Sequence, residues 1–137
     1  MSKELKIFTT YHSISPKDGI NISLFQPKFK HYDNTAKLFV PTYQLFKIQD
    51  YNVLTNAWNE KLKQTFNEKY LEQYLYDLQG DNDRVVLCCY EKDRNTCHRK
   101  IIGDFITLFL GIEVKELDTN TKVENKKNEN NVIKSLF

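Results

Sequence analysis

The alternation of hydrophobic and polar positions along the chain predicts short strands that alternate with helices. Continuous apolar runs rich in β-branched and aromatic residues are typical of strands buried inside a sheet, and they occur at residues 5–11, 21–25, 85–90 and 112–117. Apolar residues spaced three and four apart predict helices over about 41–48, 52–65, 68–79 and 97–110. A strand–helix–strand connection is right-handed and joins parallel strands. We therefore expect an α/β fold with about four mostly parallel strands, doubly wound, with helices on both faces.

The pattern changes after residue 117. Residues 118–131 contain five asparagines and many charges, a composition that predicts disorder. The last six residues, 132–137, are apolar again, and they fit either a segment that folds back on the domain or a short docking peptide for a partner protein. We expect one α/β domain over 1–117 and a disordered or fold-back tail over 118–137.

Composition narrows the classes of protein that this chain can belong to. Hydrophobic residues make up 40% of its 137 residues, enough for a core, and the formal charge of +2 gives no electrostatic footprint of a nucleic-acid binder. No apolar run is long enough to cross a membrane, and no signal peptide is recognisable, so we expect a cytoplasmic protein. Three cysteines, two of them adjacent, make no disulfide framework. Heavy use of Lys and Asn hints at a low-GC bacterium or its phage.

The segment 85–99 carries the candidate chemistry, because it contains all three cysteines of the chain. A buried strand ends there and an apolar helix begins, and ligands of open α/β sheets bind at the carboxyl ends of strands. Cys97 is expected in the first turn of the helix, where unpaired N–H groups and Arg99 would lower the pKa of its thiol. Cys88 and Cys89 point to opposite faces of the sheet, and we expect Cys88 to point into the helix layer.

Two sets of candidate site residues follow. Catalytic roles are expected of Cys89, Glu91, Cys97 and His98. Anion or substrate binding is expected of Arg99, whose guanidinium fork suits planar oxyanions, and of Tyr11 and His12, which follow the first strand. Glu91 has two candidate roles: a general acid or base beside the thiols, or an ion-pair partner that fixes Arg99.

The same segment resembles the domain of unknown function 488 family. The hallmark of that family is a strand that ends in Cys-x-Glu, a short loop, and a Cys-His-Arg sequence that opens a helix; it is matched here by Cys89, Glu91, Cys97, His98 and Arg99. Weaker similarity extends over roughly residues 5–117. The resemblance implies a compact Rossmann-like α/β domain and no established activity. Arg94 stands where many members have proline, and the Asp-Val-Arg motif of longer members is absent, so the chain resembles the shorter branch.

The preferred hypothesis is a cytoplasmic thiol-dependent enzyme that needs no cofactor and acts on a small anionic or nucleotide-like substrate. One alternative is a non-catalytic module that binds a nucleotide, a nucleic-acid end or, through its tail, a protein. Another is a structural cluster without a ligand. A metal site would use Cys89, Cys97 and His98, but the sequence offers no fourth zinc ligand at a typical spacing. The Cys-x5-Arg spacing of Cys88 and Arg94 matches a phosphate cradle only by chance, since acidic residues in the loop would repel a phosphate.

Overall fold

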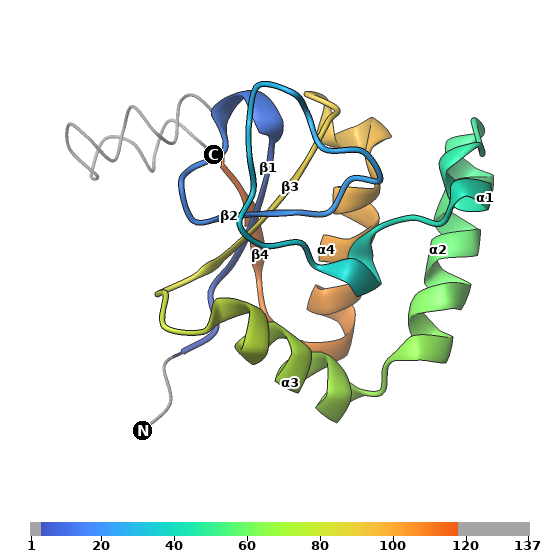
Figure 1. The fold of residues 1–137 in the computed structure, drawn as a ribbon. Helices are drawn as coiled ribbons and strands as arrows, with labels where there is room; N and C mark the ends of the chain where they lie inside the picture. Colours follow the sequence, from blue (N-terminus) through green and yellow to red (C-terminus); the bar gives the residue numbers. More distant parts are fainter. Residues whose placement is uncertain (1–3, 118–137) are drawn as a thin grey trace, which may run out of the picture.

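A computed structural model describes residues 4–117, with four strands and four α-helices (Figure 1). The strands are β1 (Ile7–Tyr11), β2 (Gly19–Asn21), β3 (Val85–Cys89) and β4 (Val114–Glu116). The helices are α1 (Tyr43–Phe46), α2 (Tyr51–Thr65), α3 (Glu68–Gln79) and α4 (His98–Leu110), with short 3-10 turns η1 (His12–Ile14), η2 (Lys37–Phe39) and η3 (Arg94–Thr96). The predictions made for 118–137, disorder and a docking segment, lie outside the described residues.

The four strands form one all-parallel sheet in the order β2-β3-β1-β4. Ile7 at the start of β1 lies opposite Val85 on one side and Val114 on the other, and Tyr11 at its end lies opposite Cys89. The carboxyl ends of the strands therefore meet at one edge of the sheet. This arrangement confirms the predicted α/β class and the parallel sheet.

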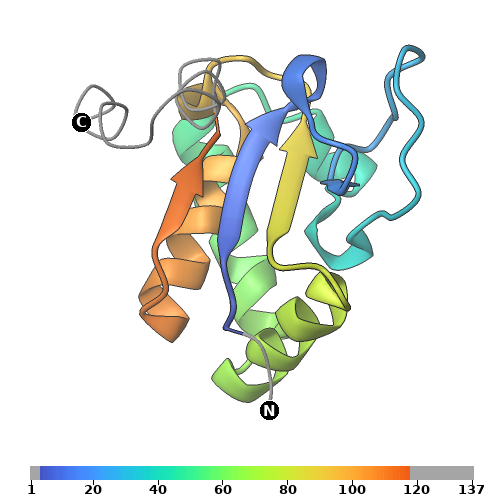
Figure 2. The same cartoon turned by 90° about the vertical axis from the view of Figure 1, so that its left-hand side faces the viewer.

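All four described α-helices lie on one face of the sheet, as Figure 2 shows with the strands in front of them. Alternate residues of β3, namely Val85, Leu87 and Cys89, pack with the helices in the main core. The expected second helix layer is missing among residues 4–117. This layer is missing because the connection between β1 and β2, residues 12–18, spans only seven positions and holds one 3-10 turn. A connection of that length cannot contain a helix of several turns.

The opposite face carries a smaller cluster built from Phe8, Val86, Cys88, Leu117 and Tyr32. Cys88 therefore points away from the helices, and the prediction that it enters the helix layer is wrong. Its sulfur lies 2.9 Å from where a β-carbon on Gly19 would stand, so only glycine fits beside it. Burial raises the pKa of the Cys88 thiol to about 11, which keeps that thiol protonated and unreactive at neutral pH.

Local signals define the helices that frame the site. The Asp50 side chain accepts hydrogen bonds from two backbone N–H groups at the start of α2, and Asn67 does the same for one at the start of α3. Gly111 ends α4 with a left-handed φ of 69°, a conformation that favours glycine. Within the described part of the chain, no helix is both long and apolar enough to span a bilayer.

Candidate functional site

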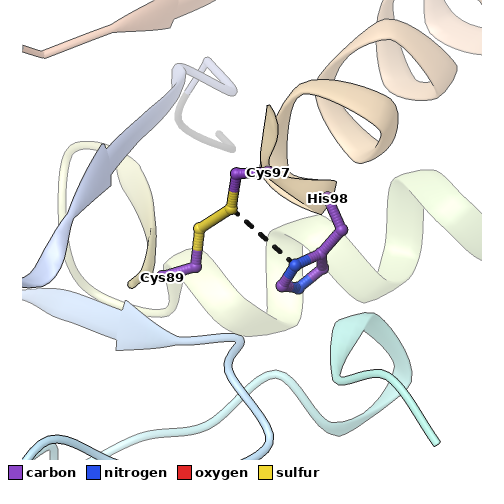
Figure 3. A group of neighbouring side chains, drawn as sticks. All are labelled: Cys89, Cys97 and His98. Atoms are coloured by element: carbon purple, nitrogen blue, oxygen red, sulfur yellow. Dashed lines mark hydrogen bonds between the residues drawn. A yellow bond between two sulfur atoms is a disulfide. The ribbon is translucent and has the colours of Figure 1, made fainter. Parts of the chain in front are cut away.

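The two cysteines of the predicted site meet at the carboxyl edge of the sheet. Cys89 is the last residue of β3, and Cys97 immediately precedes α4 as its N-cap residue. Their sulfur atoms are joined in a disulfide across the loop 90–96, as Figure 3 shows. The hydroxyl of Tyr51 in α2 donates to the carbonyl of Cys97 at 3.2 Å, which fixes the start of α4 against α2. The structure thus brings together two sulfurs that the sequence separates by eight positions.

His98 completes this cluster from the first turn of α4. Its Nδ1 lies 3.9 Å from the Cys97 sulfur, the contact that Figure 3 marks. Its Nε2 lies 2.8 Å from the carbonyl oxygen of Ile22. Because a carbonyl can only accept, Nε2 carries the proton and Nδ1 turns a lone pair toward the sulfur. The imidazole stacks on Trp58 with ring centroids 5.3 Å apart. Burial lowers the pKa of His98 to about 4, so the ring is neutral at pH 7.

Arg99 is completely buried, and its guanidinium is bonded on several sides by protein groups. It donates to the Glu116 carboxylate from Nε at 3.2 Å and from Nη2 at 2.8 Å. It also donates to the backbone carbonyls of Glu91 and Lys92 and contacts the Cys89 sulfur at 3.3 Å. The expected Arg99–Glu91 ion pair is replaced by Arg99–Glu116, since Glu91 contributes its carbonyl and its side chain is exposed.

Arg99, in α4, ties the loop after β3 to Glu116 in the edge strand β4, which lies beside β1. Thr9 in β1 donates to Glu116 at 2.6 Å, so the carboxylate is held from two sides. The Arg99 guanidinium also lies 3.3 Å from the Cys89 sulfur, so the same cation contacts the site and the edge strand. The role of Arg99 as a clamp for a substrate anion stays a prediction.

Tyr11 and His12 lie at the same edge but do not line the pocket described below. Tyr11 is half-buried beside Cys89, whereas His12 is fully buried and bonded at both ring nitrogens. Its Nδ1 lies 2.6 Å from the Tyr32 hydroxyl and its Nε2 lies 3.0 Å from the Ser23 hydroxyl. Burial, with smaller effects of nearby positive charges, lowers the pKa of His12 to about 4. That Tyr11 and His12 contact a substrate stays a prediction.

A pocket of about 530 Å³ opens at the cluster, a volume that suits a small molecule. Part of its wall is the chemical site itself: Cys89, Glu91, Cys97 and His98. The rest is mainly apolar and comes from α1, α2 and the segment after β2: Leu24, Phe25, Pro41, Leu45, Phe46, Ile48, Leu54 and Trp58, with Ser23, Tyr90 and Thr96. All four residues expected to be catalytic therefore border one pocket.

The mouth of this pocket carries exposed aromatic rings that sequence reasoning missed. Phe25, Phe46 and Tyr90 are 57%, 52% and 48% exposed, and Phe25 meets Phe46 edge to face with centroids 5.6 Å apart. Tyr43 stacks on the far side of Phe46 at 6.3 Å. Phe25 and Phe46 lie in irregular or very short elements without periodicity, so no sequence signal places them together. We call Phe25, Phe46 and Tyr90 the aromatic rim.

The same cluster offers three donors to a metal ion. The sulfurs of Cys89 and Cys97 and a ring nitrogen of His98 lie within 4.8 Å of one another. Two thiolates and one imidazole, with a fourth position facing a pocket, fit the donor set of a catalytic zinc site. The Ile22 carbonyl that accepts from His98 Nε2 is the second-shell partner typical of metal-bound histidine. Binding would require the disulfide to be reduced.

Fold and site together define an α/β domain with a cysteine–histidine cluster at the carboxyl edge of a parallel sheet. Residues 9–108 match the family model DUF488-N3a, described as "Active DUF488-N3 subclade", and the chain belongs to the DUF488 family. This match confirms the resemblance deduced from the Cys-x-Glu and Cys-His-Arg motifs. No curated protein and no solved structure matches the chain.

Proposed function

We propose that this protein is a thiol-dependent enzyme with Cys97 as its nucleophile. One observation carries the proposal: the Cys97 sulfur borders a pocket of small-molecule size and has the unprotonated Nδ1 of His98 at 3.9 Å. A cysteine with an imidazole in reach, at the start of a helix, is the recurring arrangement of an activated thiol. A substrate in the pocket would lie against this sulfur.

Each neighbour of Cys97 has a distinct part in this proposal. The N–H groups at the start of α4 stabilise negative charge on its sulfur. The neutral ring of His98, whose pKa is about 4, orients the thiol by accepting the S–H hydrogen bond, and the proton leaves to solvent when the thiolate forms. Cys89, whose sulfur the Arg99 guanidinium contacts at 3.3 Å, is the second cysteine, and its disulfide with Cys97 must be reduced before Cys97 can act as a nucleophile. Glu91 lines the pocket with an exposed carboxylate that can exchange protons with a substrate.

The substrate class expected from the sequence is a small anionic or nucleotide-like molecule, bound without a cofactor in the cytoplasm. Support for the nucleotide-like part comes from the position of the pocket, beyond the carboxyl ends of parallel strands, where α/β domains bind such ligands. The pocket volume of about 530 Å³ accommodates a molecule of that size.

Alkylation of the reduced protein tests the nucleophile. We expect iodoacetamide to modify Cys97 at pH 7 about tenfold faster than a free cysteine peptide, with the rate falling only below a pH well under the ordinary thiol pKa of about 8.5. Peptide mass spectrometry after timed quenching gives the rate at each cysteine. Cys88 is the internal control, since its buried thiol, with a pKa of about 11, should remain unmodified in the folded protein. A Cys97 that reacts no faster than the peptide would refute the proposal.

The metal site is a second candidate, favoured by the three converging donors. We expect the reduced protein to bind one zinc ion per chain, measured by competition with a chromophoric chelator. Cys97→Ser and His98→Gln should each weaken binding by at least about tenfold, and Cys88→Ser should not change it because Cys88 lies on the other face of the sheet. A reduced protein that takes up no stoichiometric zinc would exclude this candidate and leave the thiol proposal standing.

A further inference from the structure

We infer that the pocket beside Cys97 receives an uncharged planar heteroaromatic ring, of the kind found in nucleobases, and not an anionic group. The inference rests on the proposed function, because it names the substrate class for the same site. The sequence predicts a small anionic or nucleotide-like ligand; of these properties, the inference keeps the nucleobase-like ring and drops the negative charge. Three features of the pocket carry it: its charge, its aromatic rim and a buried donor in its wall.

The charge of the pocket disfavours an anion. Among the residues whose side chains the structure describes, no lysine or arginine lines the pocket, and its only charged residue is Glu91. The Nε2 of His98 is bonded to the Ile22 carbonyl at 2.8 Å, and Arg99, behind the wall, is bonded to Glu116 and to backbone carbonyls. An anion that entered would lose hydration and meet a carboxylate, and no cationic side chain among the described lining residues would offset either effect.

Two lysines near the pocket do not make it favourable for an anion. Lys61 contacts the ring of Trp58 and Lys47 contacts the ring of Tyr43, each with its ammonium nitrogen 5.3 Å from the ring centroid. Neither lysine lines the pocket. They therefore provide no direct bond for an anionic group in the pocket.

The aromatic rim suits a flat ring. Phe25, Phe46 and Tyr90 border the pocket and each is about half exposed, so their faces and edges are available to a ligand. Aromatic rings bind nucleobases by stacking, and such stacking tolerates different bases because every base has a π face. An aliphatic ligand could fill the same volume, but it would lack the additional aromatic–aromatic attraction that rings such as Phe25 and Phe46 offer.

Trp58 supplies the preference for a heteroaromatic ring. Its side chain is fully buried in the pocket wall, and its indole N–H has no hydrogen-bond partner among the described residues. Buried donors are almost always bonded, so this N–H calls for an acceptor. The ring nitrogens and carbonyl oxygens of a nucleobase are acceptors, and a hydrocarbon ring has none. Trp58 also stacks on His98, which places its ring beside the residues that surround Cys97.

The experiment uses Trp58 as its own reporter, because it is the only tryptophan of the chain. The reduced full-length protein is titrated with adenosine, guanosine, cytidine and uridine, with excitation at about 295 nm, where tryptophan dominates the absorption. We expect a saturable change in Trp58 emission with at least one nucleoside. The 5′-monophosphate of that nucleoside should bind no more tightly, and benzyl alcohol should bind more weakly. Four nucleosides without saturation, or a monophosphate that binds tighter, would overturn the inference.

Two variants test the rim and one serves as a matched control. Phe25→Ala and Phe46→Ala should each weaken nucleoside binding about tenfold, the size expected when one stacking contact is lost. Phe29→Ala should leave it unchanged, since Phe29 is 67% exposed and lies outside the pocket. All three rings are more than half exposed, so the variants should fold. Equal affinity in all of them would also overturn the inference.

The result can be separated from that for the nucleophile. Cys97→Ser should keep nucleoside binding, and Phe46→Ala should keep the alkylation rate of Cys97. A reactive Cys97 without nucleoside binding would reject the heteroaromatic ligand and leave the proposal of a thiol-dependent enzyme standing. Nucleoside binding beside an unreactive Cys97 would reject the thiol chemistry and leave a binding pocket.

Discussion

Arg99→Met should lower the free energy of unfolding by about 3–5 kcal/mol, which urea denaturation at pH 7.5 would measure. The substitution keeps an apolar stem in the core and removes the guanidinium, which is fully buried. It leaves the Glu116 carboxylate without its cation and the carbonyls of Glu91 and Lys92 without their donor. Removing one partner of a buried pair is costly because the desolvated charge that remains is uncompensated.

The neighbouring residue provides the control for this variant. Lys100 pairs with Asp104 on the surface of α4 at 2.8 Å, and Lys100→Ala should change stability by no more than about 0.5 kcal/mol. Both substitutions remove a cation from the first turn of the same helix, so burial is the main difference between them. An Arg99→Met protein as stable as Lys100→Ala would show that the Arg99–Glu116 pair adds nothing to the fold.

Acid should destabilise the protein between about pH 6.5 and pH 4. His12 and His98 both have a pKa lowered from 6.5 to about 4 in the folded state, mainly by burial. In this window the unfolded chain binds protons that the folded chain does not, so stability falls as the pH falls and levels off below pH 4. The loss is up to about 3 kcal/mol for each histidine, a large part of the stability of a typical domain.

Urea unfolding at pH 7.5, 6.5, 5.5 and 4.5 would measure this loss. His12→Gln and His98→Gln should each remove roughly half of the difference between the two ends of the series, whatever each variant's stability at pH 7.5. The comparison is made within each variant, so damage to packing by the substitution does not affect the outcome. A slope that both variants retain in full would assign the acid sensitivity to other groups.

Local patterns were sufficient to predict the parts of the fold that depend on them. The helix expected over 68–79 has those bounds in α3, because its apolar stripe and the capping Asn67 lie within a few residues of each other. Cys89, Cys97 and His98 were expected at one edge, because a strand end and the next helix start must be close in space. The parallel sheet followed from the same chain of elements.

The ion pair of Arg99, the aromatic rim and the single helix layer depend on long-range contacts that no local sequence pattern predicts. Glu116 became the partner of Arg99 because β4 lies beside β1, an arrangement that sequence spacing does not encode. The nearer acid, Glu91, bonds Arg99 only through its backbone carbonyl, and its side chain is exposed at the pocket. The aromatic rim combines residues from the segment after β2, from α1 and from the loop after β3, and only the tertiary fold places them together. The single helix layer results from the short connection between β1 and β2, and the hydrophobic pattern does not predict on which face of the sheet a connection runs.

The strand order has a consequence for how the protein is made on the ribosome. β1 is synthesised first, yet it lies between β3 and β4, whose residues begin at Val85 and Val114. Its backbone therefore has no sheet partner until most of the domain has left the exit tunnel. We expect slow, late assembly, with an unpaired nascent strand as the part most in need of a chaperone.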